Sequence, residues 1–448
     1  MERRQPRMAH KLLIIQPSHY GSKTDRAVFK ARHRNVVPLT LPYLAALTPP
    51  DWELTLLDEQ LDPVGFDSRF DLVAISASTL NSYRAYDIAD EFRRRRVPVI
   101  IGGPHTFFHA EEASEHCDGV GVGEAETIWL KMLEDAVHGR LGGLYRAGPL
   151  PDLAGLPLPR YDLLNLSRYR PFRTYTIVSS RGCPFRCEFC SERFLLGESY
   201  RCRPIPEVIE EIRRCRSRSI FFGDSNFGGK RSRAMELMEA MVPLRVRWSA
   251  LWPTYLCCDD AFMDLAQRSG LLHLNIGLES LSPETLASMN KRFNKTHQYD
   301  EMLANLRRRG ISFSLNFIFG WDGERQSVFP ATLKFLREHK VPVAYFNVLT
   351  PVKGTPFYQR MQSEGRLLDE KEIDRWPSQS CYIRPPYGTP ASLENHVRGL
   401  YRDFYSLPSI VSRLPMPLTQ ASIASWVINF SQRRMARTER RLNNFDGY

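Results

Sequence analysis

The chain lacks a long apolar run, and this absence bears first on membranes. Its 448 residues are 43% hydrophobic and 25% charged, which is ordinary for a globular protein large enough for two or three domains. No stretch approaches the roughly 20 apolar residues of a membrane-spanning helix, and the run at residues 12–15, after the basic start, has only the length of a strand. We therefore expect no membrane span, no signal peptide and a cytoplasmic location.

The chain also lacks a concentrated block of charge, although its formal net charge is +11. Its two longest arginine runs, residues 93–96 and 307–309, each end a helical pattern just before a strand, where cations favour the helix dipole. No aromatic RNA-binding motif accompanies them. We interpret the positive charge as solvated helix ends and expect no nucleic-acid partner.

A paired cysteine framework is absent too, both for disulfides and for zinc. Nine cysteines fit a reducing compartment better than a set of disulfides. A structural zinc site needs four ligands in paired spacings, and no matching CxxC or HxxxH partner is present. Four cysteines without ligand spacing are expected to be packing residues: Cys117, Cys202, Cys215 and Cys381.

What the chain does contain is a CxxxCxxC stretch formed by Cys183, Cys187 and Cys190. Three thiolates this close together can hold three irons of a four-iron, four-sulfur cluster but cannot supply the fourth protein ligand. An iron left open can bind another molecule, so the pattern predicts chemistry rather than electron storage. A zinc loop or a chance grouping is the alternative.

The surroundings of the three cysteines indicate where they lie in the fold. Residues 175–178 are typical of a short buried strand, and residues 205–214 have the apolar spacing of a helix. The cysteines therefore lie on a loop at the carboxyl end of a strand. Barrel enzymes of alternating strands and helices have their active sites at that end.

CxxxCxxC with an aromatic residue, Phe189, before its last cysteine resembles the radical S-adenosylmethionine (radical SAM) superfamily. The resemblance implies that the amino and carboxyl groups of S-adenosylmethionine bind the open iron. It also implies that an electron from the cluster cleaves the sulfonium. The metal ligands would be Cys183, Cys187 and Cys190.

Strand patterns recur through residues 173–355, which we predict to be the barrel domain. With the strand before the cysteines they number six, and the other five are residues 220–222, 246–250, 273–277, 312–318 and 344–349. Helical stretches separate them. The superfamily resemblance implies a partial (βα)6 barrel.

Polar residues follow several of these strands. Asp224 and Asn226 are placed to meet a ligand, with turn formation or helix capping as the alternative. Glu279 and Ser280 resemble the fourth-strand segment that contacts the methionine or ribose part of S-adenosylmethionine; the alternative is a cap for the helix after them. A structural role is expected for the residues that match the family's pattern after this strand: Met289, Asn290, Lys291 and Asn294.

Two adjacent cysteines, Cys257 and Cys258, follow the third barrel strand close to Asp259, a plausible helix cap. We expect a structural role for both thiols. They nevertheless lie on the side of the barrel that reaches its cavity, so they are the candidates for a catalytic thiol.

The amino-terminal third, residues 1–142, alternates strand and helix patterns. Strands are predicted at residues 12–15, 53–58, 72–76, 97–101 and 119–122, with helices at 85–95 and 126–138 among them. Such alternation predicts an α/β fold with a doubly wound, Rossmann-like parallel sheet. Ligands of such sheets bind at the carboxyl ends of the strands.

Small and polar residues follow three of these strands, and together they resemble the cobalamin-binding domain of one class of radical SAM enzymes. Glycines there allow close approach of a bulky ligand, and hydroxyl groups can bond to it. The segments GGPH and GEAE match that domain well. The candidate cobalamin-binding residues are Ser76, Ser78, Thr79, Gly102, Gly103, His105, Gly123 and Glu124.

One motif of many cobalamin domains is missing. The chain has no DxHxxG, the motif whose histidine binds cobalt, and its first loop reads Pro-Ser-His-Tyr-Gly at residues 17–21. We interpret His19 as a surface histidine and not as a cobalt ligand. The cofactor is still expected, because related enzymes bind cobalamin without that histidine.

Two further segments complete the chain. Residues 143–172 are rich in proline and leucine and are predicted to be a linker between the domains. Residues 356–448 are predicted to be a mostly helical extension. Its end, residues 422–441, combines apolar residues with arginines, so it either rests on a membrane surface or docks on the protein over the barrel mouth.

As a whole the chain resembles cobalamin-dependent radical SAM methyltransferases. The resemblance implies methyl transfer to an unactivated carbon of a lipid, tetrapyrrole or secondary metabolite, with both sets of strand ends facing one cavity. It also implies an electron donor such as flavodoxin or ferredoxin. A radical cyclase or rearrangement enzyme without methyl transfer is one alternative. A non-catalytic cobalamin-binding module is another, against which the intact cysteine triad argues.

Overall fold

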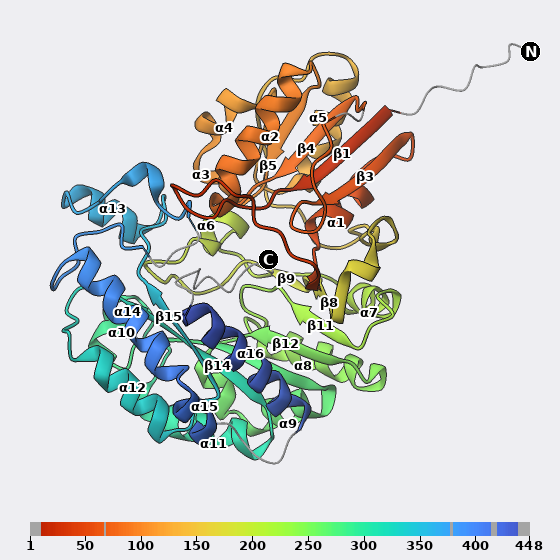
Figure 1. Cartoon of the computed structure of the whole chain (residues 1–448). Coiled ribbons are helices and arrows are strands. Elements are labelled where there is room, and N and C mark those ends of the chain that lie inside the picture. The colour runs from red at the N-terminus through yellow and green to blue at the C-terminus, as the bar shows by residue number, and fades with distance from the viewer. Residues whose placement is uncertain (1–9, 67–68, 377–379, 414–418, 438–448) are drawn as a thin grey trace, which may run out of the picture. The chain divides into compact units, whose positions relative to one another are not determined.

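The computed structural model describes residues 10–66, 69–376, 380–413 and 419–437, which form two compact units. The first unit contains the described residues up to 175 together with the short segment 374–376. The second contains the described residues 176–373 and those from 380 onward. Figure 1 labels the elements of both units.

The first unit is built on a parallel sheet of six strands in the order β3-β1-β4-β5-β6-β7. Five of them lie where the sequence predicts strands, whereas β7 lies in the segment expected to be a linker. The strands are β1 (His10–Gln16), β3 (Trp52–Asp58), β4 (Leu72–Ser76), β5 (Val99–Gly102), β6 (Gly119–Val122) and β7 (Gly143–Arg146).

Helices cover both faces of this sheet, because alternate side chains of β1 enter two separate cores. Leu13 and Ile15 pack in the core that contains α2 (Ser82–Arg94) and α4 (Ala110–His116). Leu12 and Ile14 pack in the core of α1 (Thr40–Leu47) and α5 (Trp129–Val137). Continuous apolar strands are typical of parallel sheets buried on both sides. The predicted doubly wound sheet is confirmed.

The second unit contains the half-barrel that the sequence predicts. Its strands follow one another in chain order, and β11 to β15 pair in parallel. They are β8 (Tyr169–Ile177), β11 (Ser219–Phe222), β12 (Arg247–Leu251), β13 (Leu271–Glu279), β14 (Ser312–Phe319) and β15 (Val343–Val348). The first part of β8 belongs to the first unit, where it pairs with the short strand β2 (Arg34–Val37).

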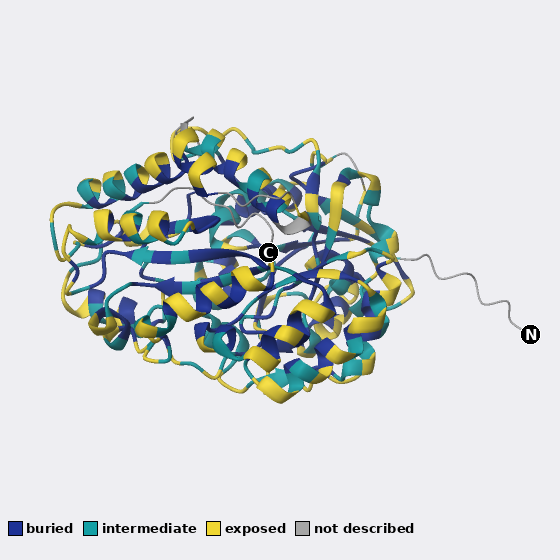
Figure 2. Cartoon of the chain, turned by 90° about the horizontal axis from the view of Figure 1, so that it is seen from below, coloured by how far each residue is buried: buried dark blue, intermediate teal, exposed yellow. Residues whose placement is uncertain are grey.

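The helices between these strands each bury one apolar side, as in α7, where Val208, Ile209 and Ile212 are buried. Figure 2 shows this pattern as buried strands flanked by helices whose outer sides are exposed. The intervening helices are α7 (Ile205–Arg214), α8 (Arg231–Met241), α9 (Asp260–Ser269), α11 (Tyr299–Arg308) and α12 (Val328–Glu338). The alternation is that of a partial (βα)6 barrel, and all its strand carboxyl ends meet at one edge.

The carboxyl-terminal extension is helical, as predicted, and comprises α13 (Pro356–Ser363), α14 (Pro390–Phe404), α15 (Leu407–Arg413) and α16 (Gln420–Arg437). Helix α16 docks on the second unit through polar residues. The Ser425 hydroxyl lies 2.8 Å from that of Ser312, the first residue of β14, and the Asn429 amide donates to the carbonyl of Pro342. Both contacts lie at the amino ends of strands, so α16 docks away from the barrel mouth. The last residues of the expected tail, 438–441, lie outside the described part of the chain.

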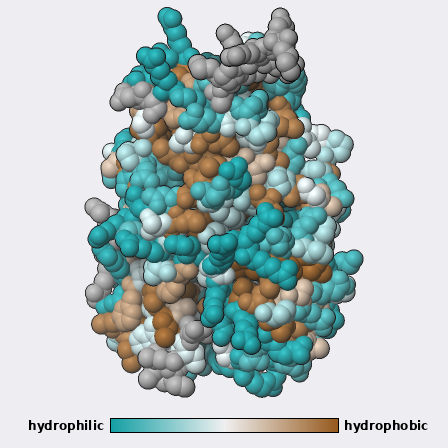
Figure 3. All heavy atoms as spheres, turned by 90° about the vertical axis from the view of Figure 1, so that its right-hand side faces the viewer, coloured by the Kyte–Doolittle hydropathy of each residue, from teal (hydrophilic) through white to brown (hydrophobic). Residues whose placement is uncertain are grey.

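No helix in the described residues is both long enough and apolar enough to cross a membrane. On the side that Figure 3 shows, hydrophobic residues form patches between hydrophilic ones. Such patches are normal on folded proteins, since more than half of a typical protein surface is apolar.

Candidate functional site

The three cysteines lie on the loop that leaves β8 at its carboxyl end, and all three are free thiols. Gly182 begins this loop with a φ of +87°, and a Cβ there would lie 2.2 Å from the carbonyl oxygen of Ser199. Only glycine fits this backbone conformation and this space. Farther along, the side-chain amide of Asn290 donates to the carbonyl of Arg186 at 2.7 Å. The loop is therefore held at both its start and its middle.

Asp224, after β11, fixes the residues that lead into the loop. Its buried carboxylate accepts four hydrogen bonds, two from the backbone N–H groups of Ser179 and Ser180 and two from their hydroxyls, at 2.6–3.2 Å. Burial raises the pKa of this carboxyl, and the four hydrogen bonds oppose that shift. Neither a turn nor a helix cap describes this role: Asp224 positions the loop that carries the cysteines.

The thiols are suited to holding a cluster. Burial raises the pKa of Cys187 to about 11 and that of Cys190 to about 12, and the charges of neighbouring cysteines act in the same direction. The Lys291 ammonium opposes the shift at Cys187. Such neutral thiols become thiolates when a cation binds them and displaces their protons.

A single metal ion fits the same thiols less well. In the described part of the chain, no three His, Cys, Asp or Glu side chains converge closely enough to hold one ion. A four-iron cluster distributes its ligands over separate irons, so it does not require such convergence. The residues present therefore fit the cluster that the sequence predicts.

Asn226 lies beside the first cysteine. Its Nδ2 is 3.9 Å from the sulfur of Cys183. Its Oδ1 is buried and has no hydrogen-bond partner among the described residues. A buried amide oxygen without a partner is costly, and a bound donor such as an ammonium group would satisfy it. Asn226 thus has an amide oxygen without a described partner beside the loop that carries the three cysteines.

Glu279, the last residue of β13, is held by an ion pair. Lys291 Nζ lies 2.6 Å from its Oε1, and the backbone has a φ of +66°. The cap of the following helix α10 (Pro283–Ser288) is Ser282, whose hydroxyl accepts from the N–H of Thr285 at 3.1 Å. The capping alternative for Glu279 and its neighbour Ser280 is therefore wrong. Both residues are buried at the carboxyl end of the strand.

The surroundings of the two adjacent cysteines after β12 indicate a structural role for both thiols. Cys257 is fully buried and accepts from the indole N–H of Trp252 at 3.2 Å, and burial raises its pKa to about 12. Burial likewise raises the pKa of Cys258 to about 11.

Their neighbour Tyr255, which the sequence analysis overlooked, is partly exposed, and the charge of Cys183 contributes to raising its pKa. Tyr255 is therefore close to the cluster loop.

A second overlooked residue, Glu324, follows β14. Its carboxylate accepts from the backbone N–H groups of Gly320 (2.8 Å) and Trp321 (3.2 Å), and burial raises its pKa to about 7. It shapes the turn after this strand much as Asp224 shapes the loop after β8. The sequence signal is an acidic residue shortly after a strand that ends in Phe-Gly.

In the first unit, the candidate cofactor residues gather at the carboxyl ends of β4, β5 and β6, which are neighbours in the sheet. The loops after β4 and β5 are joined directly: the N–H of Ala77 donates to the carbonyl of Gly102 at 2.8 Å, and the N–H of His105 donates to the carbonyl of Ala77 at 3.1 Å. The structure therefore brings together Ser76, Ser78, Thr79, Gly102, Gly103 and His105, with Gly123 and Glu124 after the adjoining strand.

The two adjacent glycines of this edge differ in whether the backbone requires a glycine at that position. Gly103 has a φ of +103°, and a Cβ there would lie 2.6 Å from the carbonyl oxygen of Ala77. A Cβ on Gly102 would meet nothing closer than 3.8 Å. Gly103 is thus required by the backbone, whereas a Cβ at Gly102 would make only ordinary contact with the carbonyl oxygen of Gly121.

His105 is fully buried at this edge. Its Nε2 lies 2.7 Å from the hydroxyl of Tyr86, and its Nδ1 lies 3.3 Å from the hydroxyl of Thr79. The imidazole therefore supports Thr79. Of the candidate residues, Ser78 and Gly123 are exposed.

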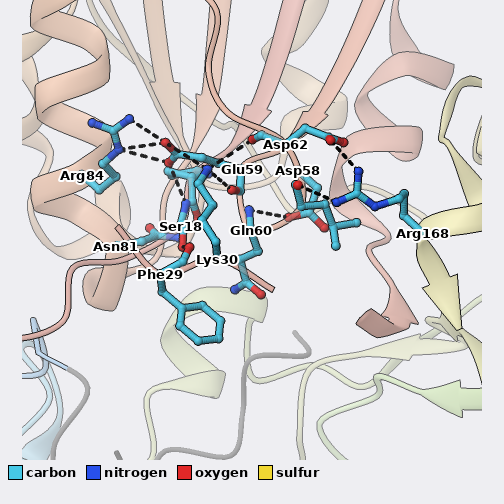
Figure 4. Close-up of polar contacts among 12 residues, drawn as sticks. Ser18, Phe29, Lys30, Asp58, Glu59, Gln60, Asp62, Asn81, Arg84 and Arg168 are labelled. Atoms are coloured by element: carbon cyan, nitrogen blue, oxygen red, sulfur yellow. Dashed lines mark hydrogen bonds and ion pairs between the residues drawn. The ribbon is translucent and has the colours of Figure 1, made fainter. Parts of the chain in front are cut away.

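Beside these loops lies a network of buried carboxylates that the sequence analysis did not single out (Figure 4). Glu59, only 1% exposed, accepts from the backbone N–H of Ser18 at 3.0 Å and from Arg84 at 2.5–3.1 Å. Asp58 accepts from Arg34 at 2.7 Å and from the backbone N–H of Gln60 at 3.1 Å. The network ties the loop after β1 to the end of β3. The sequence signal for this network is the pair of acidic residues, Asp58 and Glu59, at the end of a predicted strand.

His19 lies in that same loop after β1. It is 3% exposed and packs against the ring of Phe29 at 5.1 Å between ring centroids. The expectation of a surface histidine is therefore wrong, because the long loop folds back and buries the ring.

Comparisons with known proteins agree with this architecture. The sequence model of the Radical SAM superfamily matches residues 177–336. The chain is 32% identical to bacteriochlorophyllide d C-12(1)-methyltransferase of Chlorobaculum tepidum over 95% of its own length and 93% of that protein's. It is 26% identical to the C-8(2)-methyltransferase of the same organism, over 84% and 87% of the two chains.

Among solved structures, the fold resembles that of the radical SAM methyltransferase TsrM from Kitasatospora setae, which was solved with cobalamin and a [4Fe-4S] cluster bound. The TM-score is 0.72 with 18% sequence identity, and the match covers 96% of this chain and 100% of that one. The likeness therefore extends over both units.

Proposed function

The chain belongs to the radical SAM superfamily and is a full-length relative of its methyltransferases, and from this membership we propose that it methylates an unactivated carbon of a tetrapyrrole with the help of cobalamin. The observation that carries the proposal is the 32% identity to a bacteriochlorophyllide methyltransferase over nearly the whole length of both chains. The hopanoid C-2 methylase of Rhodopseudomonas palustris is also a relative, at 26% identity over 74% of this chain, so a carbocyclic lipid has less support as the substrate.

The three cysteines would hold the [4Fe-4S] cluster, which together with S-adenosylmethionine supplies radical chemistry when bound. Around it, Asp224 fixes the loop and Glu279 ends its strand in a buried ion pair. We assign the contacts with S-adenosylmethionine to Asn226, Glu279 and Ser280. The free Oδ1 of Asn226 supports this assignment, because an ammonium group is a suitable donor for it.

In the first unit, we assign cobalamin binding to the carboxyl edge of β4, β5 and β6. Hydroxyl groups of Ser76, Ser78 and Thr79 can bond to the cofactor, and Gly102 adds no side chain beside them. The backbones of Gly103 and Gly123 and the carboxylate of Glu124 complete the edge, whereas His105 acts through Thr79.

The test is methyl transfer by the reconstituted enzyme. Purified chain with cluster, cobalamin and a strong reductant is incubated with methyl-labelled S-adenosylmethionine and bacteriochlorophyllide d, and the pigment is examined by mass spectrometry. We expect the label in the pigment. Unlabelled pigment despite cleavage of S-adenosylmethionine would refute methyl transfer to this substrate class.

All nine cysteines are free thiols, which supports a cytoplasmic location. The proposed reductant is an electron carrier such as flavodoxin or ferredoxin.

We also propose that α16 contacts an anionic membrane surface. Its polar residues Ser425 and Asn429 are buried, whereas Ile423, Val427 and Phe430 on another side are about half exposed.

A further inference from the structure

A short segment from beyond the barrel belongs to the first unit. Residues 374–376 follow the half-barrel in the chain but pack with residues of the amino-terminal unit. Arg375, whose side chain is 2% exposed, donates to the hydroxyl of Ser82 at 2.8 Å and to the carboxylate of Glu112 at 2.5 Å. Its guanidinium lies over the ring of Tyr83, and Trp376 packs against the same ring.

The contacts of Arg375 continue to the candidate cobalamin edge. The Ser82 hydroxyl donates to the carbonyl of Thr79 at 2.9 Å. Because a hydroxyl has a single hydrogen to donate, Ser82 accepts from Arg375 while it donates to Thr79. The two hydrogen bonds therefore run from Arg375 to Ser82 and from Ser82 to Thr79, and we call this chain of two bonds the relay.

Thr79 is held from a second side by the histidine beneath it. Its hydroxyl lies 3.3 Å from His105 Nδ1, and the hydroxyl of Tyr86 lies 2.7 Å from Nε2 of the same ring. Thr79 also begins a short 3-10 helix, Thr79–Asn81, in which the backbone N–H of Ser78 donates to the side chain of Asn81 at 2.8 Å. Whatever fixes the carbonyl of Thr79 therefore also holds the backbone that carries Ser78.

We infer that Arg375 is a positioning residue for the candidate cobalamin site, acting through Ser82 on the loop that carries Ser78 and Thr79. The inference rests on the proposed function, in which this loop contacts the cofactor. A guanidinium that is buried needs its partners, so the segment 374–376 and the loop after β4 are expected to be ordered together. The part of the chain after the barrel would thus influence cofactor binding in the amino-terminal unit.

The experiment is a cobalamin titration of the full chain, followed by absorbance, for wild type and four variants. Arg375→Met and Ser82→Ala each remove one end of the relay, and each is expected to weaken cobalamin binding about tenfold, the usual effect of one lost hydrogen bond to a charged group. The double variant should bind no more weakly than Arg375→Met alone, because both changes break the same relay. Arg375→Lys should restore part of the affinity.

Glu111→Gln is the matched control, since it removes an exposed ion pair between Arg146 and the helix that carries Glu112 and leaves the contacts of Arg375 intact. We expect its cobalamin affinity to stay within about twofold of wild type. Unfolding temperature and bound iron are measured on every variant, so a general loss of structure is recognised.

Unchanged affinity in Ser82→Ala and Arg375→Met, or fully additive losses in the double variant, would overturn the inference. Ser82→Ala keeps the test decisive if Arg375→Met does not fold. A wild-type chain that binds no cobalamin would instead refute the proposed function, so the two failures are distinct.

Discussion

At the scale of single residues, Glu324 predicts a dependence of stability on pH. Burial raises its pKa from 4.5 to about 7. Below pH 4.5 the folded and unfolded states both hold the proton, whereas between pH 4.5 and about 7 the unfolded state has released it and the folded state still holds it. The stability associated with this proton is therefore lost over that window.

Glu324→Gln removes the titration and keeps an oxygen that can accept from Gly320 and Trp321. Relative to wild type, the variant should gain about 2 kcal/mol of unfolding free energy between pH 5 and pH 8. Urea unfolding at both pH values measures this. Glu338→Gln, an exposed change on α12, is the control and should show no such gain. An equal difference between Glu324→Gln and wild type at both pH values would contradict the prediction.

At the loop that carries the three cysteines, the sequence predicts which residues bind the cluster. It does not predict which residues hold that loop in place. The CxxxCxxC spacing alone indicates the cluster, because its ligands are neighbours in sequence. Asp224, in contrast, acts on serines 44 and 45 positions earlier in the chain. Such a contact depends on the adjacency of β8 and β11 and on the rotamer of the carboxylate, and no local pattern encodes either.

At the scale of elements, α16 has an unusual distribution of polarity that makes its proposed membrane contact testable. Ile423, Val427 and Phe430 are 47%, 51% and 48% exposed, and residues 419–437 contain three arginines and no acidic residue. Apolar side chains beside cations are typical of helices that lie at an anionic lipid surface. These three side chains together expose on the order of 300 Å² of apolar surface. A stable protein interface buries roughly 800 Å² per partner, so this surface is too small for such an interface.

The prediction is that the chain co-sediments with vesicles of phosphatidylglycerol and phosphatidylcholine, and that Val427→Glu with Phe430→Glu reduces binding at least tenfold. The loss is expected because buried apolar area and charge attraction both fall. Leu130→Glu, at an exposed leucine on α5, is the control and should bind as wild type does. Self-association of wild type that disappears in the double variant, without vesicle binding, would contradict the proposal in favour of a protein contact.

Strands were predictable as elements wherever they are buried on both sides. The run Leu72–Ser76 was predicted with the bounds that the structure shows, because apolar residues continue through it. By contrast, β7 is mostly exposed and has the sequence Gly-Leu-Tyr-Arg, so nothing in it distinguishes a strand from a linker. It becomes a strand by pairing with β6, which is a tertiary contact.

At the scale of the whole molecule, the sequence indicated two kinds of domain in the correct order, but not that residues 374–376 return to the first unit. Arg375 and Trp376 stand in a segment without periodicity, and their partners lie almost 300 positions earlier in the chain. Such a return has no sequence signature, because it depends on a path through space rather than on local composition.

Two units with separate cores and separate candidate cofactor sites predict that the two binding functions can be separated. Cys187→Ala removes one of the three cluster ligands and should reduce bound iron severalfold and abolish cleavage of S-adenosylmethionine. Cobalamin affinity should stay within about twofold of wild type, because the edge formed by β4, β5 and β6 has its own hydrogen bonds and core. Iron analysis, product chromatography and an absorbance titration measure the three quantities.

Cys215→Ala is the matched control, since it also removes a buried thiol of the second unit but not one of the triad. It should keep its iron and its activity, with only the modest loss of stability that a small cavity causes. Cleavage of S-adenosylmethionine by Cys187→Ala would refute the assignment of the triad as the cluster site. A parallel loss of cobalamin binding in that variant would contradict the predicted separation of the two binding functions.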